Sequence, residues 1–300
     1  MNFLANLALK LRGSLNQGGD YGYISAKNMG DHIPKIIHQT YYHKNLPVEI
    51  QQNVQYLKSL NPDWEYRLYD DNDIEAYITK HYPELLKIYN KINPTYGAAK
   101  ADFFRYILIY NEGGLYLDIK SSLQSPLNEV LLPSDRYLLS HWQNEPGQIH
   151  ENLGHQNGVD HVHGEFQQWY IAAAEGHPFL KAVIENVCNN IEKYNPFIHD
   201  TGQWGTLNLT GPIAYTSTIL PLLEKHPHRL ERDNSRYGFV YSIYESKGAR
   251  LGHIQLSKKH YTLSNESIVK LSYVSGIFFN LCQPIYIFAK NFLRGLKNQS

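Results

Sequence analysis

Cysteine is nearly absent from this sequence, whose 300 residues include only Cys188 and Cys282. Two cysteines in a chain of this length form neither a disulfide framework nor the ligand set of a structural zinc site, so we expect a reducing compartment. Net charge is also absent, because 28 Lys and Arg residues balance 28 Asp and Glu residues. This balance argues against a partner recognised through bulk charge, and we expect no nucleic acid among the partners.

The N-terminus lacks the order of segments that marks a cleavable signal peptide. In residues 1–19 the cations Lys10 and Arg12 follow the apolar part instead of preceding it. Apolar residues at helical spacing predict a short amphipathic helix here, either docked on its own domain or lying on a membrane surface. We therefore interpret residues 1–31 as an N-terminal appendage.

The C-terminal segment lacks charge over residues 271–289 and then carries Lys290, Arg294 and Lys297. The uncharged stretch is long enough to cross a bilayer, but it contains polar residues and a proline. We expect residues 266–300 to form an apolar and then basic helical tail. The favoured interpretations are a helix on a membrane surface, giving peripheral membrane contact, and a buried pair of helices; a true span is the less favoured alternative.

Between these ends, strand and helix patterns alternate. Apolar or alternating runs predict strands at 33–37, 64–68, 115–119 and 136–142, and helical patterns cover 46–62, 71–89 and 93–112. This cadence is typical of an α/β domain built from βα units, which we place at residues 32–265. Ligands of such sheets gather at the carboxyl ends of the strands, so residues 38–41, Asp70, Asp71 and Asp118 are expected along one rim.

The helix predicted over 93–112 carries an acid and a base in apolar surroundings. We expect Asn93 to cap its start and two glycines to end it. Asp102 and Arg105 are three residues apart, so they share one face of the helix. A buried acid and a buried base must be paired or must bind something polar. The helix ends just before the strand that delivers Asp118.

Four stretches together resemble the family-32 glycosyltransferases, whose sugar-binding region contains a DXD motif. They are IPKIIHQTYY from residue 33, NPDWEYRLYDD from 61, AAKADFFRYILIYNEGGLYLDIK from 98 and TGP from 210. The relatives of that family include yeast-type α-mannosyltransferases and bacterial polysaccharide-synthesis enzymes. The resemblance implies an α/β, GT-A-type nucleotide-sugar-binding fold, with a mixed, mostly parallel sheet flanked by helices, and a retaining mechanism.

The resemblance also implies roles for residues at matching positions. Thr40 and Tyr41 match the donor-binding segment, in which an aromatic ring stacks on the nucleobase. Asp102 and Arg105 stand where the family binds the donor's sugar and phosphates, and an arginine can fork onto a phosphate. Asp118 matches the first aspartate of DXD, which contacts the donor's ribose and sugar and supports the metal.

Lys120 is the point where the resemblance breaks. The family has its second aspartate there as a direct ligand of Mn²⁺ or Mg²⁺, and an ammonium group cannot ligate a cation. Three interpretations stay open: Lys120 replaces the divalent metal by neutralising the leaving diphosphate, Asp118 holds the metal with ligands from elsewhere, or the site is inactive. His260 is the candidate for the histidine that closes the family's site and for a further metal ligand.

A loop rich in histidine, glycine and asparagine runs from His141 to Glu165. Its histidines are irregularly spaced and no cysteine accompanies them, so we interpret it as a polar loop rather than a zinc site. A long loop in a transferase can cover the acceptor. Trp142, Asp160 and Glu165 are therefore the candidates for acceptor contacts.

These inferences predict a retaining glycosyltransferase that moves a hexose from a nucleotide-diphosphate sugar to a glycan or lipid-linked acceptor. The donor would be a GDP-sugar or UDP-sugar, such as GDP-mannose, UDP-galactose or a UDP-N-acetylhexosamine. The expected setting is cell-surface polysaccharide synthesis, such as capsule formation, in the cytoplasm at the inner face of the cytoplasmic membrane. Two alternatives stay open: a degenerate family member that binds a nucleotide sugar or a partner without turnover, which Lys120 favours, and a metal-dependent hydrolase that uses the histidine loop.

Overall fold

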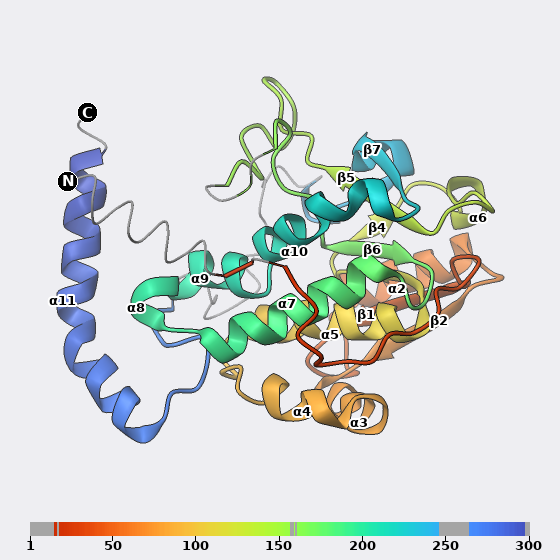
Figure 1. The fold of residues 1–300 in the computed structure, drawn as a ribbon. Coiled ribbons are helices and arrows are strands. Elements are labelled where there is room, and N and C mark those ends of the chain that lie inside the picture. Colours follow the sequence, from red (N-terminus) through yellow and green to blue (C-terminus); the bar gives the residue numbers. More distant parts are fainter. Residues whose placement is uncertain (1–14, 17, 157–158, 160, 246–263, 298–300) are drawn as a thin grey trace.

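A mixed sheet forms the centre of the molecule (Figure 1). The computed structural model describes residues 15–16, 18–156, 159, 161–245 and 264–297, with side chains up to Tyr286 in the last range. Within these residues a six-stranded sheet has the order β2-β1-β3-β6-β5-β7. Its strands are β1 Ile36–Thr40, β2 Glu65–Tyr69, β3 Gly114–Leu117, β5 Tyr137–His141, β6 Tyr170–Ala173 and β7 Arg229–Asp233. A second, two-stranded sheet pairs β4 Ser122–Leu123 with β8 Phe239–Val240.

Most neighbouring strands of the large sheet run parallel. β1 is parallel to β2 and β3, and β5 is parallel to β7, whereas β6 is antiparallel to β3 and β5. The described helices are α2 Val48–Leu60, α3 Asp71–His81, α4 Pro83–Tyr89, α5 Gly97–Glu112, α6 Leu127–Val130, α7 Pro178–Lys193, α8 Pro196–His199, α9 Gly202–Leu209, α10 Pro212–Ile219, η1 Leu220–Lys225, η2 Asn234–Tyr237 and α11 Tyr273–Lys297. A mixed, mostly parallel sheet flanked by helices confirms the predicted fold class.

The sheet separates two apolar cores. Successive side chains of a strand point to opposite faces. In β3, Tyr116 therefore joins the core formed with α5 and α7, whereas Leu115 and Leu117 join the core that includes Leu57 of α2. Strand β3 is thus buried on both faces, which fixes the position of the residues that follow it.

The carboxyl ends of β1 and β3 meet at one edge because the two strands are parallel. The residues that follow Thr40 and Leu117 emerge there, as the sequence predicts. Gly114 begins β3 with a φ of 93°, and a Cβ atom there would lie 2.6 Å from the carbonyl oxygen of Ile36. Glycine is therefore required for β3 to start this close to β1 and to deliver Asp118 to the rim.

Helix α5 begins later than predicted. Its N-cap is Tyr96 and its first residue is Gly97, so the prediction that Asn93 caps it is wrong. The side-chain oxygen of Asn93 instead accepts hydrogen bonds from the backbone N–H and the hydroxyl of Thr95, at 3.1 and 2.9 Å. Asn followed by Pro favours such a turn. The other end is as predicted, because Gly113 caps the helix with a φ of 66°.

The single helix predicted over residues 71–89 is two helices, α3 and α4. Tyr82 separates them with φ −144° and ψ 60°, and Pro83 begins α4. Proline has no N–H to donate and excludes the helical conformation from the residue before it. The predicted continuity is therefore wrong at this proline.

The described part of the N-terminal appendage is packed on the domain. The buried carboxylate of Glu185 in α7 accepts hydrogen bonds from the backbone N–H groups of Tyr21, Tyr23 and Ile24, at 2.9, 3.1 and 2.9 Å. Ile24 is 4% exposed. The amphipathic helix expected further upstream lies in residues 1–14, outside the described residues.

The described part of the C-terminal tail forms one helix, α11, so the interpretation as a buried pair of helices is wrong. Pro284 lies inside α11, where it removes one backbone hydrogen bond without ending the helix. Among the described residues, no helix has the length and apolar character needed to cross a membrane. Figure 1 shows α11 at one side of the molecule, away from the large sheet.

Candidate functional site

The backbone of Asp118 is held at the rim by hydrogen bonds at both its N–H group and its carbonyl oxygen. Its backbone N–H donates to the carbonyl oxygen of Trp169 at 2.8 Å. Its carbonyl oxygen accepts from the backbone N–H of Ser121 at 2.8 Å and from Nε2 of Gln39 at 3.1 Å. The carboxylate therefore projects from a fixed backbone, with its side chain 24% exposed.

Arg105 joins the two aspartates predicted from the sequence. Its Nη2 lies 3.2 Å from Oδ1 of Asp102, and its Nη1 lies 3.1 Å from Oδ1 of Asp118. The guanidinium carbon lies 4.6 Å from the centre of the Tyr116 ring. The side chain of Arg105 is 6% exposed, so this cation is buried between two carboxylates and an aromatic face.

Asp102 is more deeply enclosed than Asp118. Its side chain is 7% exposed, its Oδ1 accepts from Nε2 of Gln168 at 3.0 Å, and its Oδ2 accepts from the hydroxyl of Thr210 at 3.1 Å. Burial raises the pKa of Asp102 to about 6, against the opposing effect of Arg105. Asp102 thus ties α5 to the segments that carry Gln168 and Thr210, and it holds one side of the guanidinium.

Lys120 lies next to the second oxygen of Asp118. Its Nζ is 3.8 Å from Oδ2 of Asp118 and donates to the hydroxyl of Tyr241 at 3.0 Å. The same nitrogen lies 4.1 Å from the centre of the Tyr241 ring. We call Asp102, Arg105, Asp118 and Lys120 the charge cluster. Its two carboxylates and two cations balance one another.

The described residues of this region do not fit a divalent metal ion. In the part of the chain that the structure describes, no group of three or more His, Cys, Asp and Glu side chains is arranged to hold one. Asp118 has a cation beside each carboxylate oxygen, and an ammonium group near a ligand position repels a metal. His260, the further ligand expected from the sequence, lies outside the described residues.

The donor-binding candidates of β1 reach the charge cluster through Tyr116. The hydroxyl of Thr40 lies 3.0 Å from the hydroxyl of Tyr116, whose ring faces Arg105. The backbone N–H of Tyr41 donates to the carbonyl oxygen of Tyr69 at 3.0 Å, which fixes the chain just after β1. The Tyr41 ring is half-buried at the same edge of the sheet, so its stacking role stays a prediction.

Two of the acceptor candidates lie in the interior. Trp142 is 7% exposed and Glu165 is 4% exposed, and the indole N–H of Trp142 donates to Oε1 of Glu165 at 3.1 Å. The Trp142 ring lies 4.9 Å from the Tyr241 ring, edge to face. Trp142 therefore contacts Tyr241, the tyrosine that accepts a hydrogen bond from Lys120, and Glu165 is linked to it through Trp142. The third candidate, Asp160, lies outside the described residues.

Tyr241 and Gln168 are site residues that sequence reasoning missed. Tyr241 meets Lys120 across 121 positions of the chain, and Gln168 meets Asp102 across 66. Neither lies in a motif or at a regular spacing from its partner. Thr210 is different, because it begins the TGP stretch and thus carries a sequence signal.

The four residues of the charge cluster lie within a stretch of the chain that matches a known protein-family model. Residues 47–138 match the family model described as "Glycosyltransferase sugar-binding region containing DXD motif". This match confirms the resemblance to the family-32 glycosyltransferases over residues 47–138, in which Lys120 stands in place of the second aspartate of the DXD motif.

Curated relatives point to the same class. Inositol phosphoceramide mannosyltransferase 3 of Schizosaccharomyces pombe is 30% identical over 167 residues, which are 56% of this chain and 40% of that protein. The initiation-specific alpha-1,6-mannosyltransferase of Candida albicans is 27% identical over 212 residues, 62% of this chain and 52% of that protein. The chain thus spans about half the length of these relatives or less.

Among solved structures, the UDP-bound glycosyltransferase domain from the YGT toxin has a TM-score of 0.48 to this chain. It is 8% identical, and the superposition covers 84% of this chain and 90% of that one.

Proposed function

We propose that this chain is a retaining glycosyltransferase that moves a hexose from a nucleotide-diphosphate sugar to a glycan or lipid-linked acceptor. The observation that carries the proposal is the charge cluster, which places Arg105 between two carboxylates within the matched sugar-binding region. Residues 32–265 would form the catalytic domain, with residues 1–31 and 266–300 as its appendages. Mannose is the sugar named for the relatives, so GDP-mannose is the first donor to test.

Lys120 would supply the positive charge that a transferred sugar's leaving group needs. Arg105 is buried and already shared by two carboxylates, whereas the Lys120 side chain is 16% exposed and lies beside Asp118, whose side chain is 24% exposed. A nucleoside diphosphate gains negative charge as the sugar leaves, and a fixed cation stabilises that charge. Lys120 would thus take the role that a divalent metal has in the family.

Transfer would occur on one face of the sugar. The bond from the anomeric carbon to the diphosphate oxygen breaks, and a new bond forms from the same carbon to the acceptor hydroxyl oxygen on the same side. The hydroxyl proton passes to the departing phosphate oxygen, so this route needs no separate protein base. The residues' task is then to hold donor and acceptor together and to stabilise charge. Asp118 would hold the donor's ribose and sugar, and Tyr41 and Thr40 would border the base.

Trp142 and Glu165 would act on this site through Tyr241. Both side chains are buried. The Trp142 indole donates a hydrogen bond to the Glu165 carboxyl and packs on the Tyr241 ring, which in turn contacts the ammonium group of Lys120. We therefore assign them as positioning residues for Lys120 in place of direct acceptor contacts. Acceptor-contacting residues would then lie elsewhere on the rim.

The proposed setting is the assembly of a cell-surface polysaccharide, such as a capsule, at the inner face of the cytoplasmic membrane. A lipid-linked acceptor suits a chain with a long amphipathic tail helix. The contact of that helix with lipid is developed in the next subsection.

A thermal-shift panel tests donor binding. GDP-mannose, UDP-galactose and a UDP-N-acetylhexosamine would each be added to the protein with EDTA and, separately, with Mn²⁺. A ligand that binds the native state raises the melting temperature, so a shift identifies the donor class. We expect a shift that survives EDTA, followed by transfer of labelled sugar to acceptor. Binding without any transfer would favour the non-catalytic alternative, and no shift with any donor would contradict the proposal.

A further inference from the structure

Helix α11 has an apolar stripe that is largely exposed. Six residues form this stripe, with exposed fractions between 46% and 84%: Tyr273, Val274, Ile277, Phe278, Leu281 and Ile285. At about 100° per residue they fall on one side of the helix. Contiguous exposed apolar surface of this kind marks a site of interaction with protein or membrane.

The opposite side of α11 attaches the helix to the rest of the chain. Phe279 is 4% exposed, and its ring centre lies 5.3 Å from that of Phe197 in α8. The ring of Tyr286 lies 5.6 Å from the same phenylalanine. Phe279 and Tyr286 fall roughly 150° around the helix from the middle of the stripe. The stripe therefore lies mostly off the surface that packs on the domain, with only the ring of Phe278 at its edge reaching Phe197, at 5.9 Å between ring centres.

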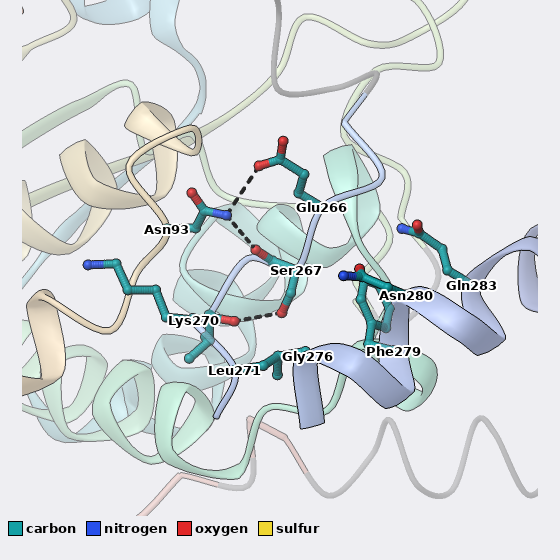
Figure 2. Close-up of a pocket in the computed structure, with 10 residues that line it drawn as sticks. Asn93, Glu266, Ser267, Lys270, Leu271, Gly276, Phe279, Asn280 and Gln283 are labelled. Atoms are coloured by element: carbon teal, nitrogen blue, oxygen red, sulfur yellow. Dashed lines mark hydrogen bonds between the residues drawn. The ribbon is translucent and has the colours of Figure 1, made fainter. Parts of the chain in front are cut away.

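Beside this attachment is a polar hollow of about 320 Å³ between α11 and residues 266–271 (Figure 2). Asn93 reaches into this region and donates to the Glu266 carboxylate at 3.3 Å and to the Ser267 carbonyl oxygen at 3.1 Å. The base of α11 is thus tied to the loop before α5, the helix that carries Asp102 and Arg105.

The charges of residues 267–300 indicate what kind of surface the stripe of α11 would bind. No acidic residue follows Glu266, whereas Lys270, Lys290, Arg294 and Lys297 all do. Amphipathic helices with this composition lie in the plane of a membrane and bind anionic lipids through both apolar area and charge. A second copy of a positively charged helix would bring like charges together instead.

We propose that α11 lies in the headgroup layer of an anionic lipid bilayer, with its apolar stripe inserted. One side of α11 packs on Phe197 of α8 and the exposed stripe lies along the other side, so the contact is parallel to the membrane surface. This inference does not depend on the transfer reaction, because lipid binding is measured without donor or acceptor. It gives the membrane setting of the proposed function a physical basis.

Vesicle flotation tests the inference with the full chain. Wild type would be mixed with vesicles of phosphatidylcholine alone and with vesicles containing an equal part of phosphatidylglycerol. We expect flotation with the anionic vesicles, weaker flotation with phosphatidylcholine, and loss of the difference in high salt, which screens surface charge. Leu281 and Ile285 are each 72% exposed, so Leu281→Ser with Ile285→Ser should lower binding at least tenfold without unfolding the chain.

Val48→Ser is the matched control, because Val48 is a 66% exposed apolar residue of α2, away from α11. It should bind vesicles as wild type does. A second readout uses Leu281→Trp, whose fluorescence should shift to shorter wavelength with anionic vesicles, whereas that of Val48→Trp should not. Unchanged flotation of the double serine variant would overturn the inference. So would a lipid-free dimer that this variant converts to a monomer, since a second copy would then cover the stripe.

Discussion

The carboxyl groups of Asp118 and Glu165 are both linked to Tyr241 through one intervening side chain, but they have very different surroundings. Asp118 connects through Lys120 and has a cation beside each oxygen. Glu165 connects through Trp142, and its Oε2 has no hydrogen-bond partner among the described residues. Burial raises the pKa of Glu165 to about 8, so it is largely neutral at pH 7. Asp118 is thus placed to act through its charge, whereas Glu165 is placed to hold a hydrogen bond in its neutral form.

Removing the guanidinium group of Arg105, which Asp102 and Asp118 share, should have the largest effect on stability and on transfer. Arg105→Met leaves Asp102 and Asp118 without their common partner in a buried setting. We expect a loss of about 3–5 kcal/mol in the free energy of unfolding, measured by chemical denaturation, together with loss of transfer. Arg67→Met, at a more exposed arginine paired with Glu65, should cost far less. Equal losses would contradict the central place of Arg105.

Removing the charge of Asp118 alone should lower the transfer rate strongly and leave the fold intact. Asp118→Asn keeps the shape of the side chain but leaves Arg105 and Lys120 without its carboxylate. We expect the transfer rate to fall on the order of 10²–10³-fold with a melting temperature close to that of wild type. Asp63→Asn, at an exposed carboxylate just before the amino end of β2, is the control and should transfer normally. Normal transfer by Asp118→Asn would contradict the site.

Replacing Lys120 with an acid should make a bound divalent metal ion, instead of the ammonium group, the source of positive charge at the leaving group. Lys120→Asp restores the spacing of a DXD motif at the rim. We expect transfer by this variant to fall roughly tenfold or more in EDTA, because fixed charge at the leaving group is lost, and to recover with Mn²⁺. Steady-state rates with and without Mn²⁺ measure this. A variant with wild-type activity in EDTA would show that Lys120 has no electrostatic role.

The smallest effect on turnover at pH 7 is expected for Glu165→Gln. The amide oxygen keeps the hydrogen bond from Trp142 and cannot ionise. Wild type should lose kcat, with KM nearly unchanged, as the pH rises through about 8, whereas the variant should not. Trp142→Phe, which removes the indole N–H, should lower kcat at all pH values. Parallel pH profiles of wild type and Glu165→Gln would contradict the positioning role.

Glu165→Gln should also change how the stability of the fold depends on pH, because the pKa of Glu165 differs between the folded and unfolded states. The folded-state pKa of Glu165 is raised from 4.5 to about 8, so unfolding releases a proton between these values. Wild type should therefore lose stability relative to Glu165→Gln as the pH rises across this window, with no further change above it. The difference between the two melting temperatures, followed against pH, measures the effect.

Local patterns were enough to predict the core of the site. Asp102 and Arg105 share a helix face, and the glycine pair that ends α5 places Asp118 at the next strand's end, so three members of the charge cluster follow from short-range spacing. Lys120 follows from its place two residues after Asp118. The rim of parallel strands brings Thr40 to the same edge.

The remaining contacts depend on how distant segments pack. Trp142 and Glu165 lie at the two ends of a long loop, and their hydrogen bond closes that loop across 23 positions. A loop rich in polar residues suggests exposure, whereas both side chains are buried. The start of α5 was also misplaced, since Asn93 and Pro94 suit a turn as well as a helix start. Tyr241 offered no signal, because only tertiary packing brings it to Lys120.

We propose that Lys120 provides the charge that a metal provides in the family-32 glycosyltransferases. The most direct measurement is calorimetric binding of GDP and of UDP to wild type and Lys120→Ala, each in EDTA and in Mn²⁺. The account predicts that wild type binds one nucleotide in EDTA, and that Lys120→Ala binds it at least tenfold more weakly with no rescue by Mn²⁺. Wild-type binding that disappears in EDTA and returns with Mn²⁺ would contradict it.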